Sequence, residues 1–147
     1  MIRDNNEEEI LRRLLTELKV LEGSVNIIQS RLNIVDAALA DLATANLSLE
    51  GVKNNSSGSE ILVPVGGGSF IRAKLSDVEK VIIGVGAGVC IDKKLEESLE
   101  DLKNRQDELE KARNSLEQQL NQTINNLNIK RNQIAEILKE RESKGIE

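Results

Sequence analysis

Few residues of this chain carry side chains that could do chemistry, and they form no catalytic group. The 147 residues include one cysteine and no histidine, so the commonest general base and metal ligand is missing. Cys90 has no histidine to activate it as a nucleophile, and a single cysteine makes no zinc site. We therefore interpret Cys90 as a small apolar residue buried on a strand, and we predict a protein that is not an enzyme and holds no metal.

Glycine clusters are the next candidates, because glycine-rich loops can bind phosphate. Residues 84–88, Gly-Val-Gly-Ala-Gly, begin like a dinucleotide-binding fingerprint, but the third glycine comes one residue early and no helix follows directly. The sequence contains no Gly-Lys-Ser/Thr either, so the Walker pattern fails. Tight turns between strands explain these glycines better, and we expect no nucleotide or other cofactor.

Two heptad runs of leucine, isoleucine and valine determine the elements that position everything else. Between Leu11 and Leu49 eleven of twelve heptad positions are apolar, and between Leu95 and Ile137 nine of thirteen are apolar. Apolar side chains repeating every 3.5 residues on average keep one face of a helix against a partner helix. The sequence therefore predicts two long helices that pair with each other as an antiparallel coiled coil.

Polar residues interrupt the second run at four positions. A polar group in such a seam costs stability but fixes the register and the number of helices. Alternatively, the seam drifts at these positions and Ile124 or Ile129 takes over. The four residues are Gln106, Arg113, Thr123 and Lys130.

A short segment rich in strand formers separates the two runs. Residues 60–65 and 69–75 predict one β-hairpin, and residues 80–85 and 89–91 predict a second, with glycine turns at 66–68 and 86–88. Pro64 has no backbone donor, which indicates an edge position or the end of a ladder.

Helix ends are predicted from capping residues. Asn6 with Glu9 is expected to begin the first helix, which runs to about Glu50 and ends at Gly51. Asp92 is expected to cap the second helix, which continues to about residue 143 with Gly145 as its stop.

The fold class that follows is mainly α with a small β body. We expect three parts: an N-terminal coiled-coil helix over 1–52, a loop and two hairpins over 53–91, and a C-terminal coiled-coil helix over 92–147. One phenylalanine, no tryptophan, no tyrosine and 31% charged residues leave little for a globular core. The strands therefore need partner strands, and we expect oligomerisation through Leu62, Val63, Val65, Phe70, Ile71, Ile82, Ile83, Val85 and Val89.

Charge and hydropathy exclude several classes of partner. The net charge of −5 argues against nucleic acid, which needs clustered Lys and Arg, and a single phenylalanine offers no series of aromatic residues for base stacking. No apolar stretch reaches the roughly 20 residues of a membrane span, and the N-terminus does not resemble a signal peptide. With a lone cysteine, this favours a cytoplasmic protein.

Apolar residues near the two ends of the chain form the sharpest candidate site. Leu15 and Leu138 fall one residue off the seam, so they widen the apolar stripe beyond what two helices bury. At the open end of a coil such residues are exposed and indicate an interaction site; simple closure of the coil is the alternative. The candidates are Ile2, Ile10, Leu11, Leu14, Leu15, Ile134, Ile137 and Leu138.

The order helix, residues 62–70 (Leu-Val-Pro-Val-Gly-Gly-Gly-Ser-Phe), residues 82–89 (Ile-Ile-Gly-Val-Gly-Ala-Gly-Val), helix resembles the prefoldin alpha subunit of archaea. Two hairpins, in place of one, distinguish alpha-class from beta-class subunits in that family. The resemblance implies a hexamer of two alpha and four beta subunits whose hairpins form a double β-barrel. It further implies that the coil tips hold unfolded polypeptides without ATP and deliver them to a group II chaperonin.

A second hypothesis keeps the same architecture but assigns it a different role. A structural or tethering coiled coil would bind one fixed partner and would have no effect on unrelated aggregating proteins. The effect on unrelated aggregating proteins is what distinguishes the two hypotheses.

Overall fold

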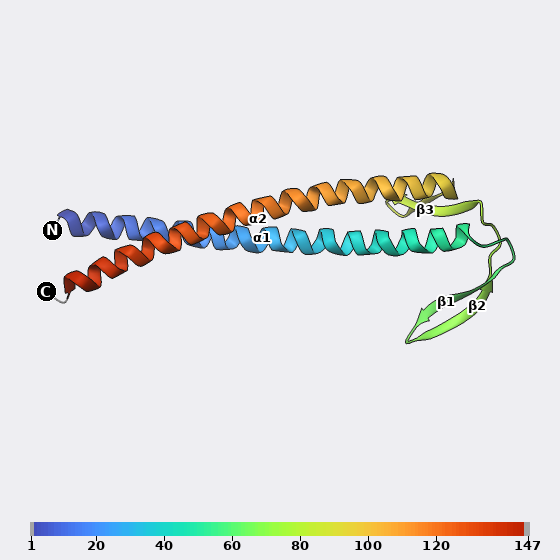
Figure 1. Ribbon diagram of the computed structural model, residues 1–147, viewed down its shortest axis with the longest axis horizontal. Coiled ribbons are helices and arrows are strands. Elements are labelled where there is room, and N and C mark those ends of the chain that lie inside the picture. Colours follow the sequence, from blue (N-terminus) through green and yellow to red (C-terminus); the bar gives the residue numbers. More distant parts are fainter. Residues whose placement is uncertain (1, 146–147) are drawn as a thin grey trace. The chain divides into compact units, whose positions relative to one another are not determined.

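Along the chain, a long helix is followed by four short strands and then by a second long helix. The computed structural model describes the backbone of residues 2–145 and the side chains of residues 5–145. The elements are α1 (Ile2–Lys53), β1 (Glu60–Gly66), β2 (Ser69–Lys74), β3 (Lys80–Gly86), β4 (Val89–Lys94) and α2 (Leu95–Gly145). Figure 1 labels both helices and the first three strands. The predicted fold class, two long helices joined by two small antiparallel hairpins, is confirmed.

The chain divides into two compact units. The terminal unit comprises the residues up to Asp36 together with those from Lys111 onward, and the central unit comprises Ala37–Glu110. Each unit therefore contains part of both helices, and the central unit also contains the hairpins.

In the terminal unit the beginning of α1 packs antiparallel against the end of α2. Ion pairs between the helices fix this direction, because Glu7 near the start of α1 pairs with Lys144 near the end of α2, whereas Asp36, further along α1, pairs with Arg113, further back on α2. The start of α1 and the end of α2 therefore lie at the same end of this unit (Figure 1). The pairs are Glu7–Lys144 at 3.8 Å, Glu17–Lys130 at 2.8 Å, Glu22–Arg131 at 3.5 Å and Asp36–Arg113 at 2.6 Å.

The buried seam follows the heptads that the sequence predicts. Leu14 and Leu32 on α1 are each 5% exposed, and Leu127 on α2 is 6% exposed. Every predicted seam position on both helices is buried or half-buried, including the four polar ones. Ile124 and Ile129 stay exposed, so the seam does not drift, and the interpretation that polar residues occupy it is the correct one.

In the central unit the start of α2 is the best buried part of the helices. Leu95 and Leu102 are buried, and the hydroxyl of Ser98 is enclosed and donates to the carbonyl of Lys94 at 2.9 Å. Lys93 forms a hydrogen-bonded ion pair with Asp101. These contacts attach the last strand to the first turns of α2.

The hairpins are two copies of one design. Leu62 pairs with Arg72 in the first and Ile82 pairs with Asp92 in the second, twenty positions further along. Each hairpin has a one-residue irregularity, between Pro64 and Gly66 and between Gly84 and Gly86, which increases local twist. Pro64 thus ends the regular ladder in a two-stranded sheet, as its missing donor predicts.

The turns of both hairpins use left-handed backbone. Gly67 has φ 57° and Ala87, at the equivalent place, has φ 51°. An alanine in this region is strained by roughly 1 kcal/mol relative to glycine, so the second turn is less favourable than the first.

Three predicted helix ends are wrong. The first helix begins before Asn6, which lies exposed inside α1, and it passes through Gly51 to Lys53. Its last turn is closed by Asn55, whose side chain donates to the carbonyl of Gly51 at 2.7 Å. The predicted stop at Gly145 coincides with the observed end of α2.

Asp92 does not cap the second helix, because β4 continues past it to Lys94. The amide of Leu95 still donates to the carbonyl of Glu79 at 2.8 Å, which extends the hairpin up to the first residue of α2. The strand pairing of Asp92 with Ile82 therefore outcompetes local helix capping.

Candidate interaction surfaces

Seven candidate residues lie near the start of α1 and the end of α2. Leu14 and Ile134 are buried in the seam, and Leu11 and Ile137 are half-buried. The three others are exposed: Ile10 by 42%, Leu15 by 44% and Leu138 by 47%. The side chain of Ile2 lies outside the described residues. We define the tip cluster as Ile10, Leu11, Leu14, Leu15, Ile134, Ile137 and Leu138.

The register of the coil brings Leu15 and Leu138 to equivalent flanking positions. Glu22 and Arg131 form an ion pair at 3.5 Å beside the seam. Seven residues toward the chain ends from this pair, one heptad on each antiparallel helix, lie Leu15 and Leu138. Leu15 and Leu138 therefore occupy the same heptad positions as Glu22 and Arg131, but they lie closer to the chain ends and are exposed leucines in place of an ion pair.

Charges in the seam are neutralised across the helix pair. The Nε of Arg113 donates to Asp36 at 2.6 Å and its Nη1 donates to Glu117 at 2.6 Å. These carboxylates, Asp36 foremost, raise the pKa of the Arg113 guanidinium. The seam arginine is thereby held in its charged form with two acceptors.

Lys130 plays the corresponding role for Glu17. Its ammonium group lies 2.8 Å from Glu17 Oε2, and this close contact lowers the pKa of the Glu17 carboxyl against a smaller opposing effect of desolvation. The sequence indicated polar seam residues but not their acidic partners, because these lie on the other helix and are found only once the register is known.

The hairpin surface is the second candidate, and we define it by nine apolar residues of the strands. Val63 and Ile83 are half-buried, whereas the other seven are exposed. Two-stranded sheets have no second layer of their own, so the apolar residues face outward. The hairpin surface comprises Leu62, Val63, Val65, Phe70, Ile71, Ile82, Ile83, Val85 and Val89.

Cys90 lies exposed on β4. The interpretation of a buried cysteine is therefore wrong, for the same reason: nothing in the described part of the chain covers this face of the hairpin. Its position on a strand is correct.

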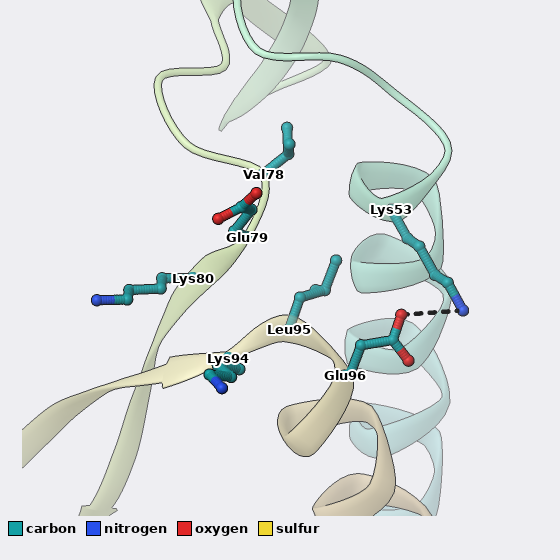
Figure 2. A pocket seen from close by; sticks show the side chains of 7 residues that line it. All are labelled: Lys53, Val78, Glu79, Lys80, Lys94, Leu95 and Glu96. Carbon is teal, nitrogen blue, oxygen red and sulfur yellow. Dashed lines mark ion pairs between the residues drawn. The ribbon is translucent and has the colours of Figure 1, made fainter.

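A pocket of about 380 Å³ lies where the second hairpin joins the helices of the central unit. Figure 2 shows Leu95 between Val78 and Glu79 on one side and the ion pair of Lys53 with Glu96, at 3.5 Å, on the other. Lys80 points away from this pair (Figure 2). The arrangement is a junction between strand and helix, with no nucleophile–base pair among its lining residues.

No helix in residues 2–145 carries an apolar stretch that could cross a bilayer. The same residues contain no group of three potential metal ligands.

Comparison with known proteins decides the family. The model of the prefoldin subunit family matches residues 21–140. The chain belongs to the prefoldin family. Relatives that are 30–37% identical include the prefoldin alpha subunits of several archaea, so the resemblance seen in the sequence is confirmed.

Two of these relatives illustrate the similarity. The prefoldin alpha subunit of Methanopyrus kandleri is 37% identical over 123 residues, which cover 82% of this chain and 78% of the relative. That of Methanococcus vannielii is 36% identical over 118 residues, covering 80% and 77%. Prefoldin subunits are chaperone subunits, and this is the class of function that membership gives.

A solved structure supports the fold independently. The cryo-EM structure of filamentous PFD from Methanocaldococcus jannaschii has a TM-score of 0.65 and 22% sequence identity, and the similarity covers 76% of this chain and 92% of the other. At this level of identity the two share the prefoldin fold, seen there in an oligomeric assembly.

Proposed function

We propose that this chain is the alpha-type subunit of an ATP-independent holdase that captures unfolded polypeptides at the tip cluster. The assembly is a hexamer of two alpha and four beta subunits, which passes its client to a group II chaperonin. The observation that carries the proposal is the exposure of Ile10, Leu15 and Leu138 beside a closed seam, in a chain that belongs to a chaperone family.

Exposed leucines on a rigid helix end favour weak capture over tight binding. Unfolded chains expose apolar side chains, and burying a leucine contributes about 1.5–3 kcal/mol. One tip therefore binds a client weakly, whereas several tips in one complex combine their contacts through avidity. Weak individual contacts also allow release without nucleotide hydrolysis.

Residues 53–91 supply the oligomerisation body in this proposal. The hairpin surface is apolar and exposed, and each hairpin leaves strand edges that can pair with further strands. Beta subunits in the cytoplasm are the partners that complete it. The helices α1 and α2 form the coil that presents the tip cluster.

Suppression of aggregation tests the proposal directly. A chemically unfolded, unrelated protein is diluted into the chain plus a beta-type partner, without ATP, and light scattering follows aggregation while chromatography gives the mass of the complex. We expect a hexamer that suppresses aggregation. The double variant Leu15→Gln, Leu138→Gln is expected to keep the hexamer and lose most of the suppression.

Leu47→Gln is the matched control, because Leu47 is an exposed leucine of α1 outside the tip cluster. If the double variant protects as well as Leu47→Gln, the tip assignment is wrong. A well-formed oligomer that protects no unrelated protein supports the rival function, a tether for one fixed partner.

A further inference from the structure

The face of α1 turned away from the seam carries a second heptad series. Its steps alternate between four and three residues, as in the seam, but small residues alternate with β-branched apolar ones. Val20, Ile27 and Ile34 are 64%, 56% and 69% exposed. We call this series the outer stripe: Thr16, Val20, Gly23, Ile27, Ser30 and Ile34, all of the terminal unit.

The equivalent face of α2 shows that such a series is not a general property of these helices. The α2 residues at the same heptad positions in this unit are polar or charged except Ile129. Three large apolar side chains at intervals of seven therefore distinguish this face of α1, and each of them is more than half exposed. The α2 residues are Lys111, Ser115, Gln118, Gln122, Asn125, Ile129, Asn132 and Glu136.

Gly23 is not explained by packing within the chain. A Cβ built at this position meets nothing within 4 Å, and glycine costs about 1 kcal/mol relative to alanine inside a helix. On the outer stripe the missing side chain leaves a hollow directly beside Ile27. A hollow next to a protruding isoleucine is the hole and knob that helix packing requires.

We propose that a second copy of this chain docks on the outer stripe, α1 against α1 in antiparallel orientation. The 3.5-residue repeat selects a helix as the occupant. Antiparallel docking places Ile27 of one copy over Gly23 of the other, Val20 over Ser30, and Ile34 over Thr16. Every layer then joins one large and one small side chain. Parallel docking would stack isoleucine on isoleucine and glycine on glycine, leaving alternate clashes and voids.

Charge and hydrogen bonding agree with this contact. Between Val20 and Ser30 the outer stripe and its flanks, Ser24 and Asn26, carry no ionisable side chain, so docking desolvates no ion there. The hydroxyl of Thr16 already donates to the carbonyl of Arg12 at 2.9 Å and leaves its methyl group for packing. The interface is two-fold symmetric and small, which makes it a reversible contact between assembled complexes.

Cysteine cross-linking of the full-length chain tests the contact and its direction. Asn26 and Asn33 are both exposed, one heptad apart on the same edge of the outer stripe. In the antiparallel arrangement residue 26 lies beside its own counterpart, whereas residue 33 lies about 24 Å from its counterpart along the helix. In a Cys90→Ser background, Asn26→Cys should form disulfide-linked dimers under mild oxidation and Asn33→Cys should not.

A second substitution ties the cross-link to the stripe. Ile27→Glu or Ile34→Glu, both at exposed positions, should reduce the Asn26→Cys cross-linking rate about tenfold or more, because an unpaired carboxylate becomes buried. Gln122→Glu on the outer face of α2 is the matched control and should leave the rate unchanged. Helicity by circular dichroism confirms that each variant is folded.

Three outcomes overturn the proposal. Equal cross-linking of the two cysteine variants means chance encounter or parallel docking, since association through the hairpins raises both rates alike. Cross-linking that is insensitive to Ile27→Glu and Ile34→Glu assigns the contact elsewhere, and the absence of cross-linking in both cysteine variants excludes the second copy as the occupant.

Discussion

The helix pair and the hairpins are built from the same apolar residue types, but they differ in where those residues are covered. Leu14 and Leu32 of the seam are buried by the chain itself, whereas Leu62 and Ile82 of the hairpins are more than half exposed. The strands are apolar on both faces, a pattern typical of strands covered from both sides. One part of the molecule is therefore complete in a single chain, and the other requires surface from outside it.

The comparison predicts that the seam tolerates truncation worst. Leu32→Ala should lower the free energy of unfolding by about 2–5 kcal/mol, because it removes transfer energy and leaves a cavity in the seam. Urea unfolding followed by circular dichroism measures the change. Leu47→Ala, at an exposed position of the same helix, should change it by less than about 0.5 kcal/mol; similar losses in both variants would contradict the seam.

A charge on the hairpin surface should break assembly and leave the helix pair intact. Ile83→Asp should weaken association at least about a hundredfold, since an unpaired buried charge costs several kcal/mol. Light scattering after chromatography gives the mass, and circular dichroism reports helicity. Leu47→Asp adds the same charge outside the hairpins and should assemble normally. Normal assembly of Ile83→Asp would reject the hairpin surface as the site of oligomerisation.

Removing the tip cluster except Leu15 should separate client holding from the stability of the seam and from assembly. A chain trimmed before Leu15 and after Gln133 keeps the central unit and most of the seam. We expect it to assemble normally but to suppress aggregation little or not at all, because two of the three exposed residues of the tip cluster, Ile10 and Leu138, are missing and Leu15 alone remains. Light scattering of a diluted, unfolded client measures this. Full suppression by the trimmed protein would remove the tips from the mechanism.

The smallest expected effect is a pH dependence of the helix pair. Lys130 lowers the pKa of Glu17 from its ordinary value of 4.5 in the folded state. The resulting stabilisation is complete above pH 4.5 and is lost as the pH falls through the lower folded value. Melting temperatures at pH 7 and pH 3 should therefore differ more for the natural chain than for Lys130→Met. Equal differences would mean that this ion pair contributes nothing.

The sequence predicts the helix pair more completely than it predicts the surroundings of the hairpin residues. Heptad spacing predicts every seam position, because the periodicity of a helix is local and its burial is one-sided. The strands are also predicted, but Asp92 and Cys90 are misassigned, since their surroundings depend on hairpin pairing and on a layer that the chain does not supply. The partners Asp36 and Arg113 are 77 residues apart, and only the register of the two helices joins them.

In the proposed association through the hairpin surface, the two hairpins give each copy of this chain two points of attachment. A subunit with one such hairpin can only terminate an assembly, whereas a subunit with two can connect one neighbour to the next. The two hairpins also differ in charge, because the first carries Arg72 at the position where the second carries Asp92. A subunit with two unlike hairpins binds different neighbours at each hairpin, and this gives the assembly a direction.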